Sequence, residues 1–181
     1  MLKINMINTK RNAQLVTIIF VLIGLFHLFN YNFAHGAMTG SSDSGSSKTL
    51  TKFERLQKKA TTLVKKAKKL EAKNKIEKAK KNYLKAYDIL KKANKIEPNN
   101  PDVLNYLGFT LRKTGDLKNA EIFYLEGLKL DATHPGINEY LGELYVETNR
   151  IELAKERLEA LRGCDCEEFE ELDALIKEKS N

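Results

Sequence analysis

The stretch from Pro101 to Leu111, Pro-Asp-Val-Leu-Asn-Tyr-Leu-Gly-Phe-Thr-Leu, returns 34 residues later as Pro-Gly-Ile-Asn-Glu-Tyr-Leu-Gly-Glu-Leu-Tyr. The proline and the Leu-Gly pair keep their places in both copies. Further along, Ala120 recurs as Ala154, and Gly115 is matched by Asn149. This period predicts repeated helix-turn-helix units, each with an apolar face that only a stacked neighbour can cover.

The first copy contains the signals of two helices joined by a turn. Asn100 is a good N-cap, Pro101 suits the first helical position, and Gly115 suits the left-handed residue after a helix. Small residues at 108 and 120 permit the two helices to approach closely. The predicted core stripes are Val103, Leu104, Leu107 and Leu111 on the first helix, and Leu117, Ala120, Tyr124, Leu128 and Leu130 on the second.

The second copy repeats this organisation. Thr133 or His134 caps the first helix before Pro135, and Asn149 takes the turn position. The stripes are Ile137, Leu141, Leu144 and Tyr145, then Ile151, Ala154, Leu158 and Leu161.

Residues 50–98 predict an elongated, Lys-rich helical hairpin with its turn at Asn74. An apolar 3-4 spacing runs along each arm and changes register at the turn. A rival alignment on Ala86, Ala93 and Pro98 would bury Lys73 and Glu77, so we favour the first. The two stripes are Phe53, Leu56, Ala60, Leu63, Ala67 and Leu70, then Ile76, Ala79, Tyr83, Ala86, Leu90 and Ala93.

The end of the chain, residues 164–181, predicts a bend followed by a capping helix with a polar outer face. Its apolar residues are Phe169, Leu172, Ala174, Leu175 and Ile176.

The N-terminal part is predicted to lie outside the core. Residues 1–37 combine Lys3, Lys10 and Arg11 with an apolar run at residues 15–29, as in a secretory signal. A retained inner-membrane anchor facing the periplasm is the alternative, although the run is short for a membrane span. Residues 38–49 are a Ser/Gly-rich flexible linker. The expected localisation is therefore exported and periplasmic.

Charge is divided unevenly along the chain. Residues 48–98 carry 18 Lys and Arg against 5 Asp and Glu, whereas residues 99–181 carry 10 against 18. A basic hairpin of this kind is either a solvated helix surface or a contact for an anionic membrane surface or polymer. The two ends could also attract each other between copies, which leaves a homo-oligomer open. A nucleic-acid partner is not expected, because the signal would export the chain and Arg clusters are lacking.

These motifs resemble the tetratricopeptide-repeat family, and more closely a group of small exported bacterial members without an assigned activity. The resemblance is strong over residues 98–176. It is carried by residues 105–109 and 139–145, with Arg112, Lys113, Asp131, His134, Gly136 and the segment around Cys164 and Cys166. It implies an all-α array of about three units: the elongated hairpin, two standard units at residues 99–163, and the cap.

In that family the first helix of each unit lines a concave groove that binds a protein or peptide. The corresponding partner-binding residues here are Asn105, Phe109, Arg112, Lys113, Glu139, Tyr140, Glu143 and Glu147. Members that clamp a C-terminal carboxylate use a Lys/Asn/Arg set that only Asn105 and Arg112 match in this chain. The glutamates of the next unit put such a clamp in doubt.

Glu139, Glu143 and Glu147 share one helix face, because they are spaced by four residues. They are either an acidic strip that receives a basic peptide or an ordinary solvated face. The spacing places all three toward solvent, so no buried carboxylate for acid–base catalysis is expected.

Cys164 and Cys166 form the only cysteine pair. They could close a disulfide that fixes the bend, pair with another chain, or take part in thiol exchange. Two thiolates are too few for a closed zinc site. Since no catalytic set or phosphate-binding loop is visible, we expect no enzyme activity, cofactor or metal, and a binding function instead.

Overall fold

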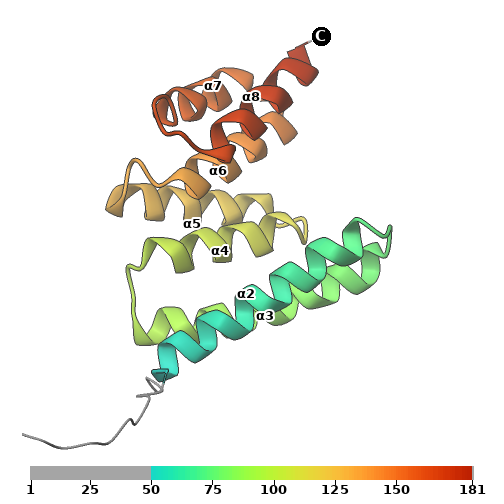
Figure 1. Cartoon of the computed structure of the whole chain (residues 1–181), viewed down its shortest axis with the longest axis vertical. Helices are drawn as coiled ribbons and strands as arrows, with labels where there is room; N and C mark the ends of the chain where they lie inside the picture. The colour runs from blue at the N-terminus through green and yellow to red at the C-terminus, as the bar shows by residue number, and fades with distance from the viewer. Residues whose placement is uncertain (1–49, 181) are drawn as a thin grey trace, which may run out of the picture. The chain divides into compact units, whose positions relative to one another are not determined.

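The structure, a computed structural model, describes residues 50–180 (Figure 1). The predicted signal or anchor at residues 1–37 and the linker at residues 38–49 lie outside the described residues. Within residues 50–180 every regular element is a helix, and none of these helices is long and apolar enough to cross a membrane. The helices are α2 (Lys52–Glu71), α3 (Ile76–Ile96), α4 (Pro101–Arg112), α5 (Leu117–Leu130), α6 (Pro135–Glu147), α7 (Ile151–Ala160) and α8 (Glu167–Ser180).

The helices pack as successive pairs that follow one another in chain order (Figure 1). The pairs are α2 with α3, α4 with α5, and α6 with α7, and α8 packs on α6 and α7. Contacts also join α2 to α4, α4 to α6 and α6 to α8, whereas in the described part of the chain α3, α5 and α7 do not contact one another. The first helices of the units are therefore the inner layer of the array, as the tetratricopeptide arrangement predicts.

The three turns inside the pairs share one backbone geometry. Asn74, Gly115 and Asn149 have φ values of 53°, 93° and 59°, in the left-handed region. In each turn the next amide donates to a carbonyl five residues earlier: Lys75 to Leu70 at 2.9 Å, Asp116 to Leu111 at 3.0 Å and Arg150 to Tyr145 at 2.7 Å. This bond satisfies a carbonyl that the helix end leaves open. The predicted turn at Asn74 is confirmed, and the rival alignment is wrong.

Side chains also define the helix starts. Asn100 accepts a hydrogen bond from the Val103 amide at 3.2 Å, so the predicted N-cap of α4 is confirmed. Of the two candidates before α6, His134 is the cap, because its Nδ1 accepts from the Ile137 amide at 3.2 Å.

Two groups of buried apolar residues form the core, one under the hairpin and α4, the other from the end of α4 to α8. Most predicted stripe residues belong to them, but Ile76 and Leu130 are 51% and 48% exposed, so their placement in the core was wrong. Both are terminal residues of their helices: Ile76 is the first residue of α3, and Leu130 is the last residue of α5.

Close packing within and between units depends on glycine. A Cβ at Gly108 would lie 2.5 Å from the buried ring of Tyr124 on α5. At Gly142, a Cβ would lie 2.4 Å from Leu172 of α8. The conserved spacing of the Leu-Gly pair in the repeat therefore serves two different contacts, one inside a unit and one against the capping helix.

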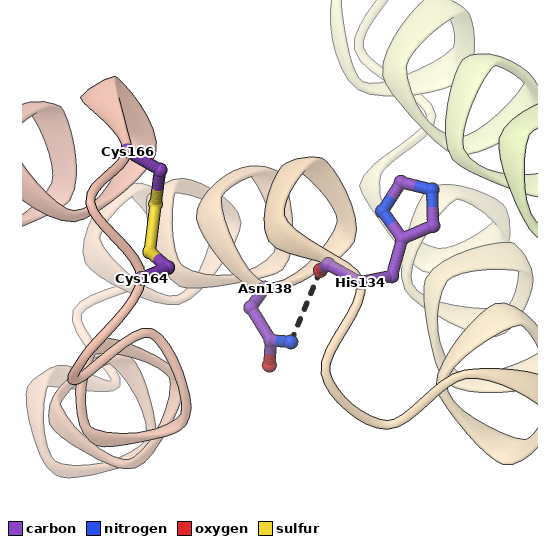
Figure 2. The surroundings of a disulfide bond; sticks show 4 residues. All are labelled: His134, Asn138, Cys164 and Cys166. Atoms are coloured by element: carbon purple, nitrogen blue, oxygen red, sulfur yellow. Dashed lines mark hydrogen bonds between the residues drawn. A yellow bond between two sulfur atoms is a disulfide. The ribbon is translucent and has the colours of Figure 1, made fainter. Parts of the chain in front are cut away.

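The connection from α7 to α8 contains a disulfide between Cys164 and Cys166 (Figure 2). Both residues are half-buried against the second core group. On α6 in the same view, the Asn138 side chain donates to the His134 carbonyl at 3.1 Å (Figure 2). It also donates to the Ala132 carbonyl at 3.0 Å, so this buried amide holds the connection that leads into α6.

Candidate functional site

The inner layer carries an aromatic cluster at its centre. Phe109 of α4 lies edge-on to Tyr83 of α3, with ring centroids 5.7 Å apart, and 4.7 Å from the ring of Tyr140 on α6. Lys68 of α2 spans this cluster: its Nζ lies 5.0 Å from the Phe109 centroid and donates to the Tyr140 hydroxyl at 3.2 Å. Three successive units are thus joined at one point.

Arg112 approaches the same aromatic pair and also reaches the acidic strip. Its guanidinium lies 5.8 Å from the centroids of both Phe109 and Tyr140. It pairs with Glu143 and, at 3.6 Å, with Glu147. Burial opposes the charge on Arg112, but the neighbouring Glu143 carboxylate and the other groups around it more than offset this, and its pKa is raised. Two of the three strip glutamates therefore have a counterion from the preceding unit.

Lys113 connects the middle unit to the hairpin. Its Nζ lies 3.0 Å from Glu71 near the end of α2. Glu71 in turn accepts a hydrogen bond of 2.6 Å from the Tyr83 hydroxyl. Burial and this hydrogen bond raise the pKa of Tyr83, so it stays a neutral donor.

The eight residues predicted to bind a partner all belong to the inner layer, but they lie at different depths. Asn105, Phe109 and Glu139 are 7%, 2% and 3% exposed. The other five are half-buried or exposed: Arg112, Lys113, Tyr140, Glu143 and Glu147. The prediction that all three glutamates face solvent was wrong for Glu139, because α8 packs across this part of α6 and covers it.

Glu139 is a buried carboxyl among other carboxyls. It forms a hydrogen bond with Glu171 of α8, and Glu143 and Glu168 are also close enough to interact with its charge. Burial, the hydrogen bond to Glu171 and these like charges raise the pKa of Glu139 to about 9. At neutral pH it therefore holds a proton and acts as a donor to Glu171.

A pocket of about 360 Å³ opens beside Glu139, between α4, α6 and α8. Asn105 lies in its wall, and the buried Oδ1 of this residue has no hydrogen-bond partner. The His134 ring is at the edge, with Nε2 3.2 Å from an Asp102 carboxylate oxygen. The polar residues and rings that line the pocket are Asp102, Asn105, Tyr106, Glu139, Tyr140 and Glu168.

One group of carboxylates in the described residues has the spacing of metal ligands. Oxygen atoms of Glu139, Glu143 and Glu171 lie within 4.8 Å of one another. Arg112 already pairs with Glu143, however, and the raised pKa of Glu139 favours its neutral form. The local charge of this group is thus partly compensated without an ion.

Sequence reasoning missed several residues of this face. Lys68 looked like one lysine among many on the hairpin, and only the packing of α2 against α4 brings it to Tyr140. Glu171 and Glu168 belong to the capping helix, whose side toward α6 could not be read from its periodicity. Asn105 was predicted as a groove residue by resemblance, and its missing hydrogen-bond partner is visible only in the fold.

Charge differs strongly along the inner layer. At one end lies α2, whose lysines are all exposed. At the other end lie the carboxylates of α6 and α8, with five of them around Tyr140: Glu139, Glu143, Glu147, Glu168 and Glu171. The face therefore changes from basic to acidic over three units.

Comparison with known proteins agrees with this architecture. Residues 89–122, from the end of α3 into α5, match the family described as tetratricopeptide repeat. No curated protein matches the sequence. The family match covers one stretch of the described helices and agrees with the helix pairs of the fold.

Solved structures share the fold at low sequence identity. The Sgt2 TPR domain from Aspergillus fumigatus is 20% identical, with a TM-score of 0.50 over 67% of this chain and 78% of that one. The translocator chaperone SycD of Yersinia enterocolitica is 14% identical, with a TM-score of 0.49 over 66% and 82%. SycD in complex with a peptide of the translocator YopD is 17% identical, with a TM-score of 0.47 over 66% of this chain and 87% of that one. The likeness to the Sgt2 domain shows the fold alone.

Proposed function

We propose that this chain is a protein-binding module of the tetratricopeptide type, which holds a peptide or helix of a partner protein on the face formed by α2, α4, α6 and α8. The observation that carries the proposal is the cluster around Tyr140, where side chains of three units meet at one surface. Aromatic residues with a charged rim are the usual composition of binding hot spots.

The buried and the exposed residues of the face have different roles in this proposal. Phe109 packs against the ring of Tyr140, and Arg112 forms an ion pair with Glu143. The groups that a partner can reach are Tyr140, Lys68, Lys113 and the 48% exposed side chain of Glu147. A partner that carries both charges would match the change from basic to acidic along the face.

We also propose that the protein is exported, either to the periplasm or on an inner-membrane anchor at residues 15–29. The support is the basic and apolar pattern of residues 1–37.

A second candidate function is contact with an anionic lipid surface or polymer through the hairpin. It is favoured by the exposure of all the lysines on α2 and α3. Each lysine near an anionic surface contributes on the order of 1 kcal/mol, so the hairpin could bind without the inner face.

The test is crosslinking capture from the envelope fraction with the full chain, comparing two double variants. Lys68→Gln/Glu147→Gln removes one positive and one negative group from the inner face. Glu152→Gln/Lys155→Gln removes an exposed pair of the same signs from α7, which belongs to the other layer. Glutamine keeps hydrogen-bonding capacity, so both proteins should retain wild-type circular dichroism.

Capture of one partner by the wild type and the α7 variant, and its loss in the inner-face variant, is the expected result. Equal capture by all three proteins would overturn the assignment of this face. Salt-sensitive binding of the same three proteins to anionic vesicles would instead favour the hairpin.

A further inference from the structure

We propose that the pocket between α4, α6 and α8 receives a cationic side chain, the guanidinium of Arg or the ammonium of Lys, from the bound partner. The inference rests on the proposed function and names the chemistry that the partner must supply. Its basis is a pocket of about 360 Å³ that is lined by the carboxyl groups of Asp102, Glu139 and Glu168 and by two tyrosine rings.

The first argument is the unsatisfied acceptor in the wall. Asn105 is 7% exposed, and its Oδ1 has no hydrogen-bond partner. A buried acceptor without a donor lowers the stability of the fold. This oxygen is buried, so a donor in the pocket reaches it only when the Asn105 amide turns, and Arg and Lys side chains have donors only.

The second argument is the excess of negative charge. Glu139 and Glu168 line the pocket together with Asp102, and Glu171 is hydrogen-bonded to Glu139 behind them. Two cations lie beside the pocket, and both are engaged: Arg112 pairs with Glu143 and Glu147, and Lys68 donates to the Tyr140 hydroxyl. Without another cation, a proton on Glu139 fulfils this role, as its raised pKa shows.

The third argument concerns shape. Tyr106 and Tyr140 supply aromatic surface to the same pocket, which suits a long side chain with an apolar stem and a cationic end. Tyr140 already has Lys68 and Arg112 near its ring, so its face attracts cations in this structure. The two rings would not contribute to the binding of a small divalent ion, so they favour an organic cation.

The test uses nuclear magnetic resonance on the full chain, with three small probes. N-acetyl-arginine amide and N-acetyl-lysine amide carry the proposed group, and N-acetyl-citrulline amide has nearly the same shape as the first without its charge. The Asn105 side-chain amide and the Tyr140 ring signals should shift with the two cations. Citrulline should bind about tenfold more weakly or worse, because a hydrogen bond to a charged group is stronger than a neutral one.

Variants separate a specific pocket from general attraction. Asn105→Leu and Glu139→Gln should each weaken arginine amide binding by about tenfold, as expected for loss of one charged hydrogen bond. The leucine variant should keep its melting temperature, because it removes the unsatisfied acceptor. Glu170→Gln, an exposed residue of α8 that does not line the pocket, changes net charge equally and should leave binding within about twofold.

Binding of the cation should also become tighter as pH rises from 6 to 8, since Glu139 must release its proton. The other charged groups around it are Asp102 and Arg112 on α4, Glu143 on α6, and Glu168 and Glu171 on α8.

Equal binding of citrulline, equal weakening by Glu170→Gln, or a response to calcium chloride alone would each overturn the proposal. If none of the probes binds but the inner-face variant still loses its captured partner, the pocket is excluded while the proposed function stands. If the probes bind but the inner-face variant captures the partner as well as the wild type does, the pocket binds cations and the proposed function is excluded.

Discussion

At the residue scale, the repeated Leu-Gly pair shows how one sequence motif is used twice. Gly108 leaves room for the Tyr124 ring within its own unit, and Gly142 leaves room for Leu172 of the next element. The sequence predicted a close approach at Gly108 from residue size, and the one at Gly142 is visible only in the structure. The side chain that fills each space is set by the packing of the neighbouring helix.

Gly108→Ala should lower the free energy of unfolding by about 1–3 kcal/mol, the usual cost of overpacking a core. The new Cβ would lie 2.5 Å from a fully buried ring that has no room to move. Urea denaturation measures the change. Alanine has the higher helix propensity, so a gain in stability would show that the contact with Tyr124 is looser than described. In the Tyr124→Leu background the same substitution should cost less, because the clash is removed.

At the element scale, three turns of one geometry join the helices of each pair. Gly115 and Asn149 occupy equivalent positions, with φ values of 93° and 59°. Their sequence signal was strong, because glycine and asparagine are the residues that tolerate this conformation. The turn of the Lys-rich hairpin was predicted at Asn74 from the break in the apolar register and from the likeness of residues 74–80 to residues 149–155, in a part of the chain that the family match does not reach.

Gly115→Ala should destabilise the protein by about 1–2 kcal/mol, the cost of a left-handed conformation for a residue with a Cβ. Nothing lies within 4 Å of the added atom, so the backbone alone accounts for the effect. Asn149→Gly should be neutral or slightly stabilising for the same reason. Thermal unfolding of both variants checks the pair. An unchanged melting temperature for Gly115→Ala would show that the turn can relax.

At the scale of the whole molecule, ion pairs join neighbouring units along the inner layer. Lys113, directly after α4, pairs with Glu71 of α2, and Arg112 joins α4 to α6. Between α6 and α8 the contact is a different one, the hydrogen bond of the buried Glu139 carboxyl with Glu171. Stability of the array should therefore depend on pH through the last of these.

Stability should fall as pH rises from about 4.5 to about 9, to the extent that Glu139 controls it. The pKa of this carboxyl is 4.5 as its ordinary value and about 9 in the folded protein. Over this range the folded state keeps a proton that the unfolded state has lost, so rising pH favours unfolding. Glu139→Gln cannot lose a proton, and the difference between its melting temperature and that of the wild type should grow toward pH 9. A constant difference from pH 5 to pH 9 would contradict the assignment.

The sequence by itself determined the helices, the turns and the repeat. These depend on local rules: the apolar spacing along one helix, the capping residues and the residues that tolerate positive φ. The assignment of eight residues to a binding groove came from the family resemblance, and all eight belong to the α4 and α6 segments of the inner layer.

Only the tertiary structure decided which of these residues are accessible and what they contact. The capping helix covers Glu139, Lys68 reaches Tyr140 across a neighbouring unit, and the Asn105 acceptor is left without a donor. Each of these facts depends on the distance between elements far apart in the chain. Spacing within a helix fixes the direction of a side chain, whereas burial and charge depend on what the adjacent units bring to it.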